Sequence, residues 1–207
     1  MIIEVCAESY EYAEKAEKAG ADRIELCKDL HLDGLTPNHE SAKRTIDRLN
    51  LPIFILIRPR KGDFTYSNEE FELMKQDIVK FKEMGCKGIV SGILNLDNSI
   101  DLNRTKELVE LSKPLEFTFH RAFDMVTDPL KELEKLIQLG VDRILTSGQK
   151  QKAVKGIELL KELKKNAKDK IIIMPGSGIN KSNIMNFKSF NEIHGSFKDE
   201  INTNILL

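Results

Sequence analysis

The sequence lacks the features that would place it in a membrane, on a nucleic acid or in an oxidising compartment. Three cysteines, Cys6, Cys27 and Cys86, are too few and too odd in number for a disulfide framework. The 32 basic and 33 acidic residues leave a net charge of −1, without the basic excess that nucleic acids or anionic membranes attract. The longest apolar runs, such as "IFILI" at 53–57, fall far short of the roughly 20 residues of a membrane helix. We therefore expect a soluble, reduced, cytoplasmic protein with neither nucleic acid nor a membrane as a partner.

The composition and length predict one folded domain over residues 1–207. Hydrophobic residues make up 41% of the chain and charged residues 31%, so a sizeable core can form and disorder is not indicated. The 207 residues fit one domain, or at most one with a small appendage. No linker, low-complexity tract or charge block suggests a second domain.

Short apolar segments rich in β-branched residues alternate with stretches of helical spacing. Eight such segments are expected to be strands: 2–6, 23–27, 53–58, 88–91, 115–119, 143–146, 170–174 and 192–196. Helix starts are indicated by Ser9, by the capping box of Ser67 and Glu70, and by Asp128 followed by a proline. Helix ends are indicated by three glycines: Gly20, Gly85 and Gly140.

Eight strands that alternate with helices predict a parallel sheet with right-handed crossovers, closed into a (β/α)8 TIM barrel. An internal echo supports closure, because "GADRIELC" at 20–27 and "GVDRILTS" at 140–147 lie four βα units apart. The last unit is expected to be short or truncated, since "FKDEINTNILL" can supply at most a short final helix.

Polar residues gather on one face of the predicted strands, close to their C-terminal ends. On a strand, residues two apart share a face. The residues concerned are Glu4, Cys6, Glu25, Cys27, Arg58, Arg60, Thr118, His120, Thr146, His194 and Ser196. In a barrel of this kind ligands and chemistry gather at that end, so we expect these side chains to line one cavity.

Each of these residues also has a purely structural interpretation. The two strand cysteines could be buried small hydrophobes, which is the commoner fate of a free cysteine. Asp22 and Asp142 lie in turns at the opposite end and could be turn residues only. Three ion pairs would account for charged members without any function: Glu25 with Arg23, Glu4 with Arg58, and Arg121 with Asp124.

A glycine-rich loop, "PGSGIN" at 175–180, follows the seventh strand and is expected to precede a helix. Backbone N–H groups of such turns often bind phosphate, so Gly176 and Gly178 are candidate ligand-binding residues. A tight turn needs glycine in any case, which leaves both interpretations open.

The motifs "EVC", "GADRIELC", "DGLTP", "IRPRKGDFTYSNEE", "TFHRAFD", "RILTSG", "PGSGI" and "EIHGS" occur in the order typical of the CutC family, which the chain resembles over nearly its whole length. The resemblance implies a cytosolic, often oligomeric TIM barrel, with a homodimer favoured, that is associated with copper tolerance and binds Cu(I). It places the proposed copper-binding cysteines at Cys6 and Cys27, with Cys86 outside those motifs. The sequence departs from the family at Asp33, where glycine is usual, and in ending soon after "EIHGS".

Two functional hypotheses follow. In the first, Cys6 and Cys27 bind Cu(I), a soft ion that accepts thiolates. Neighbouring strands lie ~4.8 Å apart, so the two sulfur atoms could come close enough to bind one metal ion. In the second, the protein is an enzyme, either a lyase, an isomerase or a hydrolase, acting on a small anionic and possibly phosphorylated metabolite. Arg58 and Arg60 would then bind the carboxylate or phosphate of the substrate. Glu25 or Glu4 would act with His120 as the general acid and base. His194 and Ser196 would line the far wall of the cavity.

Overall fold

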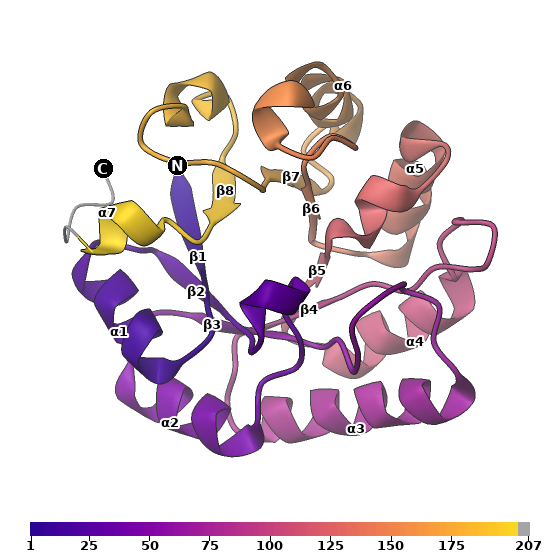
Figure 1. The fold of residues 1–207 in the computed structure, drawn as a ribbon. Coiled ribbons are helices and arrows are strands. Elements are labelled where there is room, and N and C mark those ends of the chain that lie inside the picture. The colour runs from indigo at the N-terminus through magenta and orange to yellow at the C-terminus, as the bar shows by residue number, and fades with distance from the viewer. Residues whose placement is uncertain (203–207) are drawn as a thin grey trace.

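The computed structural model describes residues 1–202 and contains eight parallel strands (Figure 1). The strands are β1 Ile2–Ala7, β2 Arg23–Leu26, β3 Ile53–Leu56, β4 Gly88–Ser91, β5 Glu116–Phe119, β6 Arg143–Thr146, β7 Ile172–Pro175 and β8 Glu192–Gly195. Their order in the sheet is β7-β6-β5-β4-β3-β2-β1-β8. A bridge between Gly176 and His194 joins the two ends, so the barrel is nearly closed. The predicted TIM-barrel fold is confirmed.

Helices surround the strands and shield them from solvent (Figure 1). The α-helices are α1 Tyr10–Lys18, α2 His39–Arg48, α3 Asn68–Glu83, α4 Leu102–Ser112, α5 Pro129–Leu139, α6 Ile157–Ala167 and α7 Lys198–Asn202. Four short 3-10 helices lie in the connections: η1 Leu30–Leu32, η2 Arg121–Met125, η3 Ala153–Lys155 and η4 Ile184–Phe187. No helix within residues 1–202 is long and apolar enough to cross a membrane.

The predicted helix boundaries are confirmed by their caps. The Ser9 side chain accepts a hydrogen bond from the backbone of Tyr12, and Ser67 with Glu70 forms the complete capping box at the start of α3. The Asp128 side chain caps α5 in the same way, with proline in its first turn. The three predicted stop glycines, Gly20, Gly85 and Gly140, have φ values of +98°, +94° and +74°.

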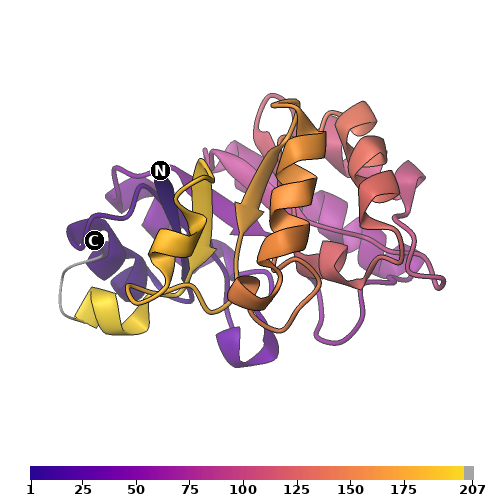
Figure 2. The same ribbon diagram turned by 90° about the horizontal axis from the view of Figure 1, so that it is seen from above.

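The seventh unit differs from the prediction. No α-helix follows the "PGSGIN" loop; the chain makes only the short η4 before it enters β8. The final helix, α7, is short, as expected: it has five residues. It lies beside α1 (Figures 1 and 2). Residues 203–207, which belong to the predicted domain, lie outside the described part of the chain.

Buried charges fill the N-terminal half of the barrel interior. The Nε of Arg23 donates to Glu4 at 2.5 Å, and its Nη2 donates to Glu192. Arg143 donates to the same Glu192 at 2.7 Å, and both guanidinium groups lie over the ring of Phe54. Paired charges can be buried at tolerable cost, so this network forms a closed floor beneath the C-terminal cavity.

The repeated Asp-Arg pair of the sequence accounts for much of this floor. Each aspartate accepts a hydrogen bond from the backbone at the start of the preceding strand: Asp22 from Ile3 at 2.8 Å, and Asp142 from Phe117 at 2.7 Å. Their interpretation as turn residues is therefore confirmed. The arginine that follows each aspartate points into the barrel and joins the floor network.

Candidate functional site

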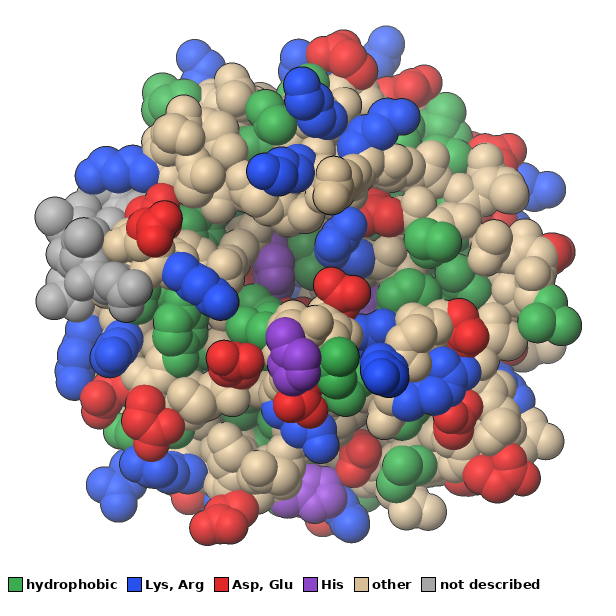
Figure 3. Space-filling view, viewed as in Figure 1, with side chains coloured by type: hydrophobic (Ala, Val, Ile, Leu, Met, Phe, Trp, Pro, Cys, Tyr) green, Lys and Arg blue, Asp and Glu red, His purple; other side chains and the backbone are tan. Residues whose placement is uncertain are grey.

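A cavity of about 680 Å³ opens at the C-terminal ends of the strands. Its size lies in the range of small-molecule sites in proteins. The face drawn in Figure 3 is hollowed near its centre, and histidine is visible inside the hollow. Seven of the predicted site residues line this cavity: Cys6, Glu25, Arg58, His120, Gly178, His194 and Ser196.

Cys6 lines one wall of the cavity, whereas its neighbour Cys27 and the predicted site residue Glu4 are buried outside the lining. Cys6 is the fifth residue of β1, and its register partner on β2 is Glu25, two residues before Cys27. The two sulfur atoms are 3.6 Å apart and both side chains are buried. The hydrogen bond to Cys27, together with burial and the charge of Glu25, raises the pKa of the Cys6 thiol. The expected approach of the two sulfurs is therefore present.

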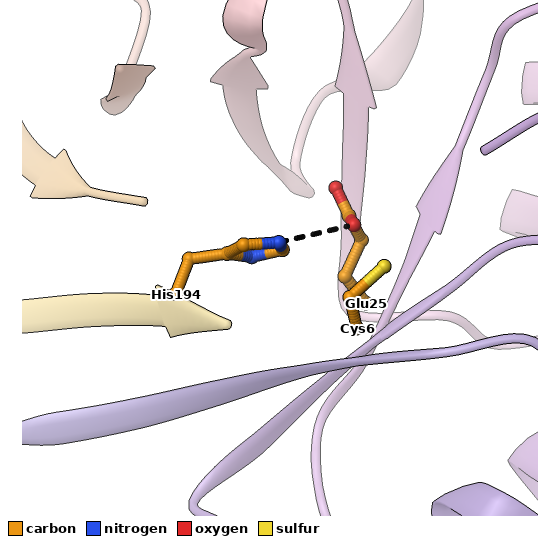
Figure 4. Close-up of side chains that lie close together, drawn as sticks. All are labelled: Cys6, Glu25 and His194. Carbon is orange, nitrogen blue, oxygen red and sulfur yellow. Dashed lines mark ion pairs between the residues drawn. The ribbon is translucent and has the colours of Figure 1, made fainter. Parts of the chain in front are cut away.

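Glu25 and His194 complete the cluster around Cys6 (Figure 4). One donor atom of each of these three residues lies within 4.8 Å of the other two. Nε2 of His194 is 3.7 Å from a carboxylate oxygen of Glu25, and its Nδ1 is 2.8 Å from Glu4. The imidazole therefore lies between two carboxylates, which β1 and β2 supply.

The charges of this cluster are set by the floor below it. Burial alone would raise the pKa of Glu4, but the charge of Arg23 and the bond from His194 outweigh it and lower this pKa to about 2. Burial raises the pKa of Glu25. For His194, burial opposes the charged form, but Glu25 and Glu4 outweigh it and raise the pKa. The ionised Glu4 makes Nδ1 of His194 the hydrogen-bond donor.

His120 lies on the side of the barrel opposite the cysteines, at the end of β5. Its Nδ1 accepts a hydrogen bond of 3.2 Å from the backbone N–H of Ala122, so its proton resides on Nε2. Burial and the nearby charge of Arg58 lower the pKa of His120 to about 3. The ring packs directly on the backbone of Gly92, where a Cβ would lie 2.6 Å from Nδ1. His120 is therefore a neutral, rigidly placed imidazole.

Arg58 holds the loops that form the cavity rim. Its guanidinium donates hydrogen bonds of 3.0 to 3.3 Å to four backbone carbonyls, those of Leu32, Asp33, Gly34 and Gly62. The suggested structural pair of Glu4 with Arg58 is wrong, because Glu4 pairs with Arg23. The suggested pair of Glu25 with Arg23 is wrong as well, because Glu25 lies beside His194.

The remaining predicted site residues have other environments. Arg60 is outside the cavity lining, where it pairs with Asp63 and Glu70 at 2.9 and 2.7 Å. Ser196 lines the cavity, and its carbonyl accepts a bond from the Tyr12 hydroxyl. Gly176 bridges to His194 across the β7–β8 gap and donates its N–H to the carbonyl of Thr146, and Gly178 lines the cavity. Arg121 pairs with Asp124 at 2.9 Å, as its structural interpretation predicted.

Two residues that sequence reasoning missed shape the site. Phe64, in the loop after β3, places its ring 4.9 Å from that of His120 and 5.0 Å from the guanidinium of Arg58. An aromatic residue inside the polar stretch "KGDFTYS" was the signal that could have found it. Glu192 shares the inward face of β8 with His194, two residues later, which the strand periodicity could have indicated.

The profile of the CutC family matches residues 1–199. The chain belongs to the CutC family. A CutC family protein of Pasteurella multocida is 46% identical over 183 residues, which cover 88% of this chain and 75% of that protein. The human copper homeostasis protein cutC homolog is also 46% identical over 183 residues, which cover 67% of its length. The crystal structure of a copper homeostasis protein CutC from Streptococcus agalactiae matches with a TM-score of 0.89 at 30% identity, covering 95% of this chain and 98% of that one.

CutC family membership confirms the resemblance noted in the sequence and connects the chain to a family named for copper homeostasis. In this CutC family member, the wall of the cavity offers the Cys6 sulfur and an imidazole nitrogen of His194, and the Cys27 sulfur lies next to that of Cys6. Thiolates and imidazole are ligands that suit copper, whereas hard cations prefer oxygen. The donor set at this wall therefore fits a soft metal ion.

Proposed function

We propose that the protein binds one Cu(I) ion through Cys6 and Cys27, with Nε2 of His194 as a third ligand. The observation that carries this proposal is the 3.6 Å separation of the two buried sulfur atoms at the mouth of the barrel. The two thiols face each other on an apolar base that includes Phe54, Leu56 and Val90, and Cys6 also lies beside two polar groups, Glu25 and His194.

The sulfur separation favours a bent, three-coordinate site over a linear one. With a metal–thiolate bond of about 2.3 Å, as zinc makes, sulfur atoms 3.6 Å apart subtend an angle of about 100° at the metal. A linear site would require the sulfurs to move apart by about an ångström. A third ligand from the same wall removes that need, and His194 is the soft-metal ligand closest at hand.

Glu4 supports His194 in this role. A metal-binding histidine commonly donates its other ring N–H to a carboxylate, which fixes the ring and leaves the second nitrogen for the metal. Nδ1 of His194 makes such a bond to Glu4, and Arg23 in turn holds Glu4. Nε2 of His194 faces Glu25 and the neighbouring thiol of Cys6 (Figure 4).

The test is Cu(I) binding in competition with a chromophoric chelator under reducing, anaerobic conditions. We expect about one Cu(I) per chain, lost in Cys6→Ser and in Cys27→Ser. Cys86→Ser is the matched control, because that buried thiol precedes β4, at the N-terminal end of the strands, and belongs to neither motif. Equal Cu(I) affinity of the wild type and the Cys6→Ser, Cys27→Ser double variant would contradict the proposal.

A further inference from the structure

Two buried hydrogen-bond donors of side chains that line the cavity, Nε of Arg58 and Nε2 of His120, have no partner among the residues that the structure describes. The His120 side chain is buried as a whole. An unpaired buried N–H costs roughly 1 to 3 kcal/mol, so such a group needs a compensating role. Because Nδ1 is held by Ala122 and the ring packs on Gly92, the imidazole cannot turn to find a partner.

A cation without a carboxylate partner lies in the same wall. The Arg58 guanidinium donates its four hydrogen bonds to backbone carbonyls, and no acidic side chain among residues 1–202 forms an ion pair with it. Arg58 and His120 both contact the ring of Phe64, which places them side by side along the cavity. This wall therefore offers a neutral donor and a positive field that no acidic side chain neutralises through direct contact.

The rest of the cavity excludes some ligand classes. Several apolar side chains line it, among them Leu30, Leu56, Leu94 and Leu145, which suits a short carbon chain. A phosphate dianion is disfavoured, because no α-helix lies between β7 and β8 and the N–H of Gly176 already donates to the carbonyl of Thr146. Acidic side chains such as Asp33 and Asp63 at the rim would also repel a doubly charged group.

We propose that this cavity binds a small 2-oxo carboxylic acid, with its oxo group accepting the Nε2–H of His120 and its carboxylate in the field of Arg58. A neutral imidazole is a suitable donor to a neutral carbonyl oxygen, as in enzymes that polarise carbonyl groups with an uncharged histidine. The carboxylate of the ligand supplies a single negative charge opposite Arg58, with which no acidic side chain of the described residues forms an ion pair. This site is separate from the proposed copper ligands, which lie on β1, β8 and directly after β2, whereas His120 follows β5.

The experiment is a titration of the wild-type protein, labelled with 15N in its four histidines, with pyruvate as the probe. We expect a saturable shift of the His120 Nε2 signal and no change at His39, which bonds to Asp77 away from the cavity. Acetate, which lacks the oxo group, and acetone, which lacks the carboxylate, should each bind about tenfold more weakly.

His120→Phe keeps a ring of similar size but removes the donor, and should weaken pyruvate binding about tenfold. His39→Phe is the matched control and should bind pyruvate as the wild type does. The Cys27→Ser variant, whose altered side chain does not line the cavity, should retain pyruvate binding even though it loses copper, which separates this proposal from the previous one. No saturable shift at His120 in the wild type, equal binding of acetate and pyruvate, or unchanged affinity in a folded His120→Phe protein would overturn it.

Discussion

Glu4 accepts a hydrogen bond of 2.8 Å from Nδ1 of His194, and this bond connects the charged floor of the barrel to the cavity above it. On its other side, Glu4 accepts from Nε of Arg23. All three side chains are buried. The proposed copper ligand is therefore oriented by a carboxylate that is itself fixed by an arginine.

Glu4→Gln keeps the shape of the side chain and removes its charge. Because the substitution leaves Arg23 with only one carboxylate partner, we expect the free energy of unfolding in urea to fall by about 3 kcal/mol. Loss of the charged acceptor for His194 should also lower Cu(I) affinity by about 10- to 100-fold. Glu11→Gln is the control: its pair with Arg44 is exposed to solvent, so this substitution should leave the free energy of unfolding almost unchanged. Equal stability of the two variants would show that the floor network does not hold the fold.

Copper binding should strengthen as pH rises. The pKa of the Cys6 thiol is raised by its bond to Cys27, by burial and by Glu25, so at neutral pH the metal must displace its proton. Each proton released makes the apparent affinity rise about tenfold per pH unit below the thiol pKa. Chelator competition at a series of pH values from about 6 to about 9, corrected for the protonation of the chelator, measures this slope. An apparent affinity that does not change with pH would mean that the thiols are not the ligands.

His120 should make the protein less stable in mild acid. Burial and the charge of Arg58 lower its pKa to about 3 from the usual 6.5, so the unfolded state binds the extra proton between these values. The stabilising preference for the neutral ring is complete above pH 6.5 and is lost as the pH falls towards 3. In that window this one group should decrease the free energy of unfolding by about 1.4 kcal/mol per pH unit.

The measurement is urea unfolding at about pH 6 and about pH 5, above most carboxyl titrations of an unfolded chain. The contribution should disappear in His120→Phe and persist in the control variant His39→Phe. His194 has the opposite sign: its pKa is raised, so its stabilising contribution is already complete below the unfolded value of 6.5. The same pH slope in His120→Phe as in the wild type would show that His120 is not held neutral.

Arg58→Lys should destabilise the protein by about 2 kcal/mol, because an ammonium group cannot bond four carbonyls that point at a planar guanidinium. Arg60→Lys is the matched control. Arg60 also makes several hydrogen bonds, but its side chain is 34% exposed, so this substitution should lower the free energy of unfolding by less than about 1 kcal/mol. The two variants are compared by urea unfolding, and equal effects would contradict the role of Arg58 in holding the rim.

Local patterns in the sequence were sufficient to predict the fold. Strand positions, helix caps and stop glycines depend on residues within a few positions of one another, so they could be identified without a structure. The same periodicity placed Glu4 with Cys6 and Glu25 with Cys27 on the inward face of their strands. The prediction of an α-helix after "PGSGIN" was wrong: the segment before β8 forms only the short η4.

Only the tertiary structure decided which side chains interact across the barrel. The sequence could not show that Glu4 pairs with Arg23 and His194 rather than with Arg58, since strand stagger and loop paths set those distances. It also could not show that η1 and the loop after β3 would surround Arg58 with carbonyls, or that His120 would keep an unpaired N–H. Periodicity fixes the face on which a residue lies, whereas its partner depends on the three-dimensional closure of the sheet.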